Sequence, residues 1–221
     1  MPTKSTWIAV ALAAFLGIGL VVWRQDGGRE SIEVSAAPVE VTLAGHALRV
    51  PRNAIRFPAQ RVPGPQIRLD LAMLPPDWSG RTEANADRFD EPGDRSAVVW
   101  VTLASAAGEL DSAARLATVY ARLFVGDPLE APADLGLVGR RLSPQAGYAG
   151  EEVWFEPGVV RPFVARCYPL AADGPVAVCI GEDIVAGLLV TRRFARARLG
   201  DWRNLSAGLT ARLADWGVPG P

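Results

Sequence analysis

Alternating apolar and polar residues predict β-strands in the first half of the folded region. Residues 39–43 and 47–50 each alternate, and Gly45 lies between them. This pattern is typical of a β-hairpin with its turn at the glycine. The alternation recurs over 67–71, which predicts a third strand. The nearly continuous apolar run 97–103 predicts a strand buried on both faces.

Residues 74–96 are polar and rich in turn formers, so we expect them to be a loop. Helical periodicity follows in two places. Over 109–125 apolar residues recur at spacings of three and four, so the pattern predicts an amphipathic helix with one packed face. A second such stripe runs from Asp201, a suitable N-cap, to residue 216, where Gly217 ends it.

Shorter apolar runs indicate further strands between the two helices, at residues 152–155, 163–168, 176–180 and 184–194. Strands then outnumber helices, and each helix has one apolar stripe suited to packing on a sheet. The sequence therefore predicts an α+β fold with a mostly antiparallel sheet and two amphipathic helices.

The N-terminus carries one uncharged apolar run, residues 7–23, with a tryptophan at each end. A single transmembrane helix would have this length and these interfacial residues. We predict a short cytoplasmic tail at 1–6, an anchor at 7–23, a flexible linker at 24–38 and an extracytoplasmic domain at 39–217. A cleaved signal peptide is the alternative, but its cleavage site would lie unusually far from the apolar run. The expected location is the inner (cytoplasmic) membrane.

Cys167 and Cys179 are the only cysteines. In a hairpin centred on Asp173 they would lie directly opposite each other, which allows a cross-strand disulfide. Their 11-residue spacing, without a nearby histidine, does not match a metal site or a redox pair. We predict a disulfide, with two buried thiols as the alternative.

Composition excludes several classes of protein. The chain has 221 residues, 49% of them hydrophobic, and a net charge of −1, which argues against a disordered chain and against a nucleic-acid-binding protein. Of its 23 basic residues only Lys4 is a lysine, and no phosphate-binding loop is present. The arginine-rich, lysine-poor usage fits a bacterial genome rich in G and C.

Candidate catalytic chemistry is sparse. His46 is the only histidine, lies beside the predicted turn and has no G-x-S-x-G partner motif. Glu151 and Glu152 could act as the paired carboxylates of a glycosidase. The acidic residues between 85 and 94 could bind calcium, but their spacing does not match an EF-hand. We predict no catalytic residue, no metal and no cofactor.

Two features could form an interaction surface. Trp78 lies in the predicted loop and could be an exposed interface anchor. Five arginines cluster near the second helix and could meet an acidic partner or anionic lipid. The predicted surface consists of Trp78, Arg192, Arg193, Arg196, Arg198 and Arg203.

An anchor, a linker, a folded domain and no catalytic constellation together favour a non-enzymatic binding or scaffold protein. We expect an accessory component of a bacterial envelope assembly, with the lipid bilayer and an envelope protein as partners. An envelope glycan hydrolase using Glu151 or Glu152, and a module that binds anionic lipid surfaces, are the alternatives.

Overall fold

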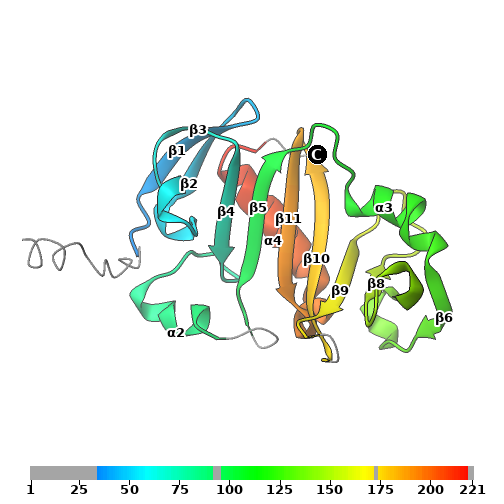
Figure 1. Cartoon of the computed structure of the whole chain (residues 1–221). Coiled ribbons are helices and arrows are strands. Elements are labelled where there is room, and N and C mark those ends of the chain that lie inside the picture. Colours follow the sequence, from blue (N-terminus) through cyan, green and yellow to red (C-terminus); the bar gives the residue numbers. More distant parts are fainter. Residues whose placement is uncertain (1–33, 92–95, 172–173, 219–221) are drawn as a thin grey trace, which may run out of the picture. The chain divides into compact units, whose positions relative to one another are not determined.

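The computed structural model describes residues 34–91, 96–171 and 174–218, which belong to one compact unit, Glu33–Pro221 (Figure 1). The strands are β1 (Pro38–Leu43), β2 (His46–Pro51), β3 (Gly64–Gln66), β4 (Arg68–Met73), β5 (Val99–Ser105), β6 (Phe124–Leu129), β7 (Val138–Leu142), β8 (Glu152–Phe155), β9 (Val164–Pro169), β10 (Val176–Val185) and β11 (Leu188–Ala195). The α-helices are α2 (Ala86–Phe89), α3 (Ser112–Thr118) and α4 (Trp202–Asp215).

The predicted anchor, residues 7–23, lies outside the described residues, as do the tail 1–6 and most of the predicted linker. Within the described part of the chain, no helix is long and apolar enough to cross a membrane.

The predicted first hairpin is present and forms a sheet with β3, in the order β2-β1-β3. Val39 lies opposite Val50, and the turn consists of Ala44 and Gly45, both with positive φ. Residues 39, 41 and 43 are buried while their neighbours are exposed, so one face of this sheet packs inward.

The other eight strands form one sheet in the order β4-β5-β11-β10-β9-β8-β7-β6, and every pairing in it is antiparallel. With few helices beside it, the unit has a mixed α+β fold, as predicted. The strand predicted at 67–71 begins at Arg68 and joins this sheet, whereas Ile67 is 94% exposed.

One face of the large sheet holds the main core. The small sheet and α4 both cover this face, and Figure 1 shows α4 behind the strands. Helix α4 follows the predicted stripe, since Trp202, Leu205, Leu209 and Leu213 are all buried. A smaller core cluster around Tyr120 and the short helix α3 packs on the opposite face, at the β8–β9 side. In front of β4, β5 and β11 no described helix covers the sheet (Figure 1).

The predicted disulfide is also present. Cys167 of β9 lies opposite Cys179 of β10, and the two fully buried sulfur atoms are bonded. It joins two central strands of the large sheet beneath α4.

The predicted helix at 109–125 is much shorter than expected. Helix α3 begins after the N-cap Asp111 and ends at Thr118, and β6 already starts at Phe124. Only part of the expected apolar face is packed, because Leu110 is 46% exposed and Ser112 is buried, whereas Tyr120 lies in the smaller core cluster. Pairing of β6 with β7 accounts for the early end, since it places Phe124 in the smaller core cluster.

Two further predictions need correction. The predicted strand 184–194 is a hairpin, because the chain reverses at Ala186 and Gly187, both with positive φ. The predicted loop 74–96 contains two helical turns, Glu83–Asn85 and Ala86–Phe89. The first is stabilised by a capping box, in which the Asn85 side chain accepts a hydrogen bond from the Thr82 backbone nitrogen.

Candidate functional site

The open face of β4, β5 and β11 carries the most organised group of polar side chains. Strand alternation sends apolar residues to the core, so their neighbours point the other way. The register then brings residues from three strands together. Asp70 lies opposite Thr102, which lies opposite Thr191, and Trp100 lies opposite Arg193. These side chains, together with Arg56 and Arg68, line a hollow of about 60 Å³.

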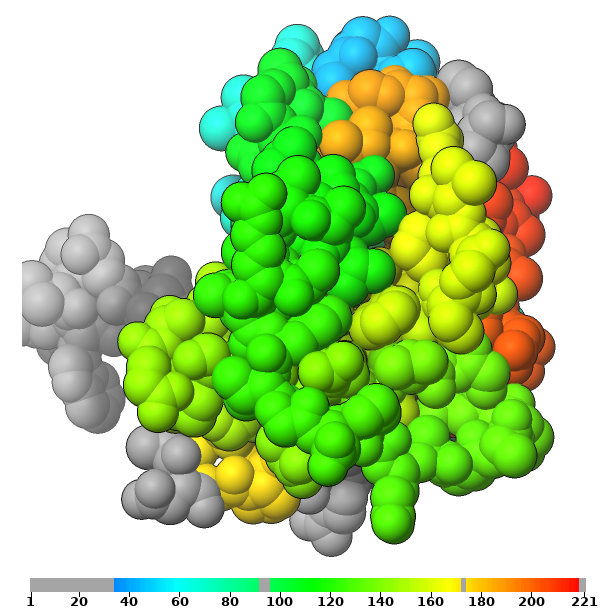
Figure 2. All heavy atoms as spheres, turned by 90° about the vertical axis from the view of Figure 1, so that its right-hand side faces the viewer, coloured from blue at the N-terminus to red at the C-terminus, as the bar shows by residue number. Residues whose placement is uncertain are grey.

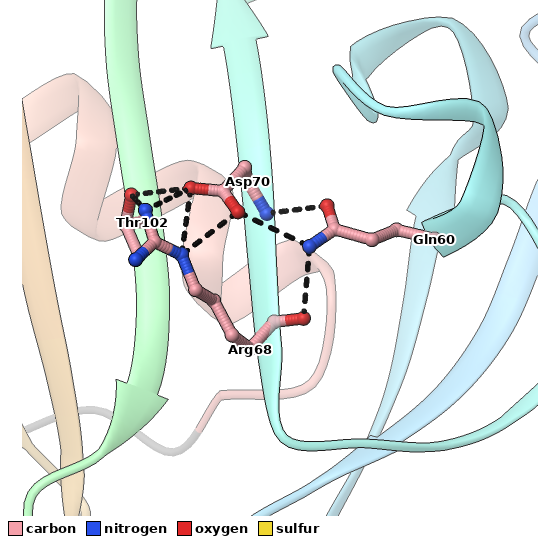
Figure 3. Close-up of polar contacts among 4 residues, drawn as sticks. All are labelled: Gln60, Arg68, Asp70 and Thr102. Carbon is pink, nitrogen blue, oxygen red and sulfur yellow. Dashed lines mark hydrogen bonds and ion pairs between the residues drawn. The ribbon is translucent and has the colours of Figure 1, made fainter.

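Asp70 is the centre of a hydrogen-bonded cluster (Figure 3). Arg68 donates to both carboxylate oxygens, with Nε–Oδ2 at 2.8 Å and Nη2–Oδ1 at 2.7 Å. Thr102 donates its hydroxyl to Oδ1 at 2.8 Å, and Gln60 donates its amide to Oδ2 at 3.1 Å. The Gln60 oxygen in turn accepts from the Asp70 backbone nitrogen. Three side chains thus bind one buried carboxylate.

The charges in this cluster are stable at neutral pH. Burial alone would raise the pKa of Asp70, but the hydrogen bonds from Arg68, Thr102 and Gln60 outweigh it and lower that pKa below its usual range. The hydrogen bonds to Asp70 raise the pKa of Arg68. Asp70 is therefore an anion that holds Arg68 in place while most of the Arg68 side chain, 58%, stays exposed.

A second arginine is held by aromatic rings. The guanidinium of Arg56 lies 4.6 Å from the ring centroid of Trp100 and 4.8 Å from that of Phe57. Such cation–π contacts orient a long side chain without removing its charge. Trp100 and the exposed Arg193 also line a neighbouring hollow of about 140 Å³, which extends to Leu170.

We call the surface formed by Arg56, Arg68, Trp100, Thr102 and Arg193 the arginine face. It offers guanidinium donors around a half-buried tryptophan. The Asp70 carboxylate beside them already has three side-chain donors, and the exposed Glu91 lines the neighbouring hollow. In the part of the chain that the structure describes, no group of three or more metal-ligating side chains occurs. This chemistry suits recognition of an anionic surface.

The residues predicted to form an interaction surface do not form one together. Trp78 is 5% exposed and packs in the main core against Gly208, because the loop folds back onto α4. Arg192 and Arg193 point to opposite faces of β11, and only Arg193 belongs to the arginine face. Trp78 is therefore not an exposed anchor.

The remaining predicted arginines are engaged one by one. Strand β11 ends at Ala195, so Arg196 and Arg198 lie beyond it in a 3₁₀ helix and do not share a strand face with Arg192. Arg196 donates to Glu152, and Arg198 donates to Asp201 and to the Ala97 carbonyl. Arg203 donates to the Leu135 carbonyl.

The other chemical candidates have ordinary structural partners. Glu151 pairs with Arg166, and Glu152 accepts from Arg196 at 2.6 Å, so the two carboxylates have different cations as partners. His46 Nε2 lies 2.8 Å from the Ala186 carbonyl oxygen. In the acidic loop, Asp90 binds Arg81 through both carboxylate oxygens.

Sequence reasoning missed most of the arginine face. Arg68 and Asp70 were visible only as the polar positions of an alternating strand. Trp100 lies in the apolar run that predicts a strand buried on both faces, and nothing in the sequence links these residues to Arg56.

Comparisons with known proteins show the fold. No protein-family model and no curated protein matches the chain. Among solved structures, the chain is similar to Smlt3025, an immunity protein of the Stenotrophomonas maltophilia type IV secretion system. That match has a TM-score of 0.56 and 16% identity, and it covers 84% of this chain and 95% of that one. The chain is also similar to the Neisseria meningitidis iron-regulated outer membrane lipoprotein FrpD, with a TM-score of 0.51, 10% identity and coverage of 84% and 97%. At such identities the likeness concerns the fold alone.

Proposed function

We propose that this chain is a membrane-anchored, non-enzymatic binding protein of a bacterial envelope, and that the arginine face docks an acidic partner protein. The observation that carries the proposal is the Arg68–Asp70 pair on an uncovered sheet face. A buried anion fixes the orientation of an exposed cation there, and such preorganisation lowers the entropy cost of binding.

The charge of the arginine face selects the kind of partner. Arg56, Arg68 and Arg193 supply three positive charges, and Asp70 supplies one negative charge that is already bound to Arg68. Arginine and tryptophan are the residues most enriched at the energetic centres of protein interfaces. An acidic surface with apolar residues at its centre would complement this face.

Two further observations support an envelope role. The structural neighbours are an immunity protein of a secretion system and an outer membrane lipoprotein. The Cys167–Cys179 disulfide fits a domain in an oxidising compartment outside the cytoplasm. The anchor at residues 7–23 remains a prediction from the sequence.

Site-specific photo-crosslinking in intact cells tests this proposal. A photoreactive amino acid at Thr191, beside the hollow of the arginine face, should capture one acidic envelope protein. The matched control places it at the exposed Thr42 of β1, in the small sheet that covers the other face of the large sheet. Capture from both positions alike, or from neither, would contradict the proposed surface.

Variants of this protein distinguish the proposed function from the two alternatives, lipid binding and glycan hydrolysis. A lipid-binding module would bind anionic vesicles through its domain, and double reversal of Arg68 and Arg193 to glutamate would abolish that binding. A glycan hydrolase would lose activity in the Glu151→Gln and Glu152→Gln variants. We expect neither effect, because the arginine face is proposed to bind protein and each glutamate already pairs with an arginine.

The proposed anchor has its own test. Full-length protein should sediment with membranes and resist extraction by alkaline carbonate, while a variant that lacks residues 7–23 should be released. A periplasmic reporter fused to the C-terminus should be active if the domain lies outside the cytoplasm. Release of the full-length protein by carbonate would contradict the anchor.

A further inference from the structure

A second cavity lies on the other face of the large sheet, between α4, the end of β10 and Arg192 of β11. It has a volume of about 320 Å³, which is at the lower end of the range for small-molecule sites. In Figure 2 the yellow segment that leads into β9 lies between the green segments and the orange-red of α4. The residues that matter for its chemistry are Asp111, Phe163, Asp183, Arg192, Trp202 and Ser206.

Arg192 is the unusual residue in this cavity. It is only 3% exposed although it carries a full charge. Gly181 lies opposite it on β10, and an added Cβ there would lie 2.8 Å from the Val164 carbonyl oxygen and 3.0 Å from Arg192 Nη2, so the glycine leaves room for both. Nη1 binds the carboxylate of Asp183, whereas Nε is buried and has no hydrogen-bond partner among the described residues.

One exposed carboxylate offsets little of the cost of burying this charge. The Asp183 side chain is 45% exposed, so water competes for it. Burial lowers the pKa of Arg192 to about 10, which is the expected effect when desolvation is not balanced by nearby anions. A second anion beside the guanidinium would offset the remaining desolvation cost of the buried charge.

The helix side of the cavity adds a second unpartnered group and an apolar wall. Ser206 Oγ is buried and has no hydrogen-bond partner among the described residues. The rings of Phe163 and Trp202 lie 4.8 Å apart, and the Arg192 guanidinium lies 4.9 Å from the Phe163 ring. Arg192 Nε and Ser206 Oγ are two of the seven buried side-chain polar atoms without a hydrogen-bond partner among the described residues, and both residues line this cavity. Two such atoms at one cavity point to a ligand.

We propose that this cavity binds a small organic carboxylate, with the carboxylate on Arg192 and Ser206 and the apolar body against Phe163 and Trp202. Two of the three carboxylates that line the cavity are already engaged. Asp183 binds Arg192, and Asp111 accepts the Ala114 backbone nitrogen at 2.7 Å as the N-cap of α3. The third, Glu156, shares the lining with the exposed Arg161, whose charge is opposite.

The test uses full-length protein in detergent and ¹⁹F NMR. The probe is 4-fluorobenzoate, and its neutral match is 4-fluorobenzamide, which has nearly the same shape. We expect saturable binding of the benzoate and binding weaker by about tenfold or more for the benzamide, since a charge-assisted hydrogen bond is lost. Equal binding of the two probes, or no saturable binding of the benzoate, would overturn the proposal.

Variants test whether Arg192 and Ser206 bind the carboxylate. Arg192→Met should abolish benzoate binding, and Ser206→Ala should weaken it, while Arg122→Met removes an exposed arginine elsewhere and should change nothing. Removing one partner of a buried ion pair usually destabilises a protein, but Asp183 is 45% exposed and water can solvate it, so we expect Arg192→Met to fold, and its urea midpoint checks this. Arg192→Lys, which keeps the charge, covers the case in which Arg192→Met does not fold. Arg192→Lys should weaken binding, because it lacks the second donor of the guanidinium. Wild-type affinity in Arg192→Met, or in Arg192→Lys where only that variant folds, would overturn the assignment.

The carboxylate could belong to a free metabolite or to a peptide C-terminus. N-acetyl-alanyl-phenylalanine and its C-terminal amide distinguish these sources. Tighter binding of the acid than of benzoate, lost in the amide and in Arg192→Met, supports a peptide end. Weaker binding than benzoate supports a free small molecule. This site is separate from the arginine face, so reversal of Arg68 should leave benzoate binding unchanged.

Discussion

Arg68 lies two residues before Asp70 on the same face of β4, and its guanidinium binds that carboxylate through both Nε and Nη2. The carboxyl group is buried, whereas most of the arginine is exposed. Thr102 and Gln60 complete the shell of donors around it. The pair therefore places a buried anion directly beside an exposed cation of the proposed binding surface. It should affect both the stability of the domain and its recognition of a partner.

The Asp70→Asn variant tests the structural role of the pair. The amide keeps the shape of the side chain but leaves Arg68 without its anion and Thr102 facing a weaker acceptor. We expect a loss of about 1–3 kcal/mol in the free energy of unfolding, as for other buried groups that lose a charged partner. Urea denaturation measures it, with Asp87→Asn on the exposed side of α2 as the control. Equal stability of the two variants would show that the cluster contributes nothing.

The same cluster predicts a pH dependence. The pKa of Asp70 is lower in the folded protein than the ordinary value of about 3.9 expected for the unfolded chain. Its contribution to stability is therefore complete above that value and is lost as the pH falls through the lower, folded pKa. The difference in stability between the wild type and Asp70→Asn should shrink below about pH 4. A stability difference between the two proteins that stays constant down to about pH 2.5 would contradict a lowered pKa of Asp70.

Removal of the disulfide should destabilise the domain without changing its fold. Cys167 and Cys179 enclose a loop with a sequence separation of 12, for which chain entropy predicts about 3 kcal/mol. Both positions are fully buried, so the double variant to alanine isolates the bond from thiol chemistry. Thermal unfolding with and without reductant should show a large difference for the wild type and none for the double variant. A wild type that is insensitive to reductant under unfolding conditions would contradict the bridge.

Gly208 allows Trp78 to enter the core. A Cβ at this position of α4 would overlap the Trp78 indole, including Nε1. Although alanine favours a helix, we expect Gly208→Ala to destabilise the protein by about 1–3 kcal/mol, because a well-packed core must shift. Gly200→Ala, where nothing lies within 4 Å of the added atom, is the control. Higher stability of Gly208→Ala than of wild type, on the same thermal scan, would show that Trp78 is not held there.

Local patterns were enough to predict much of the fold. The first hairpin, the cysteine register and α4 each depend on periodicity or symmetry within a short stretch. The helix at 109–125 was overestimated because its apolar spacing fits a helix, whereas pairing with β7 favours a strand from Phe124 onward. That pairing is a tertiary contact, which a local pattern does not contain.

The candidate site was harder to predict because it depends on strand order. Arg192 and Arg193 are adjacent in the sequence, yet one is buried under α4 and the other is exposed on the opposite face. Asp70 and Arg193 share one hollow only because β5 lies between β4 and β11. Of the five arginines that cluster along the chain, only Arg193 belongs to the arginine face, and Arg56 and Arg68 are brought to it by the order of the strands.

The most direct test of the central claim is the affinity of the partner captured at Thr191 for the full-length protein in detergent. Calorimetry would compare the wild type with the double variant Arg68→Glu and Arg193→Glu, with Arg122→Glu as the control. We predict that the double variant binds weaker by about a hundredfold, and that wild-type binding weakens with added salt. Equal affinity of the double variant and the wild type would contradict the assignment of the arginine face as the docking surface.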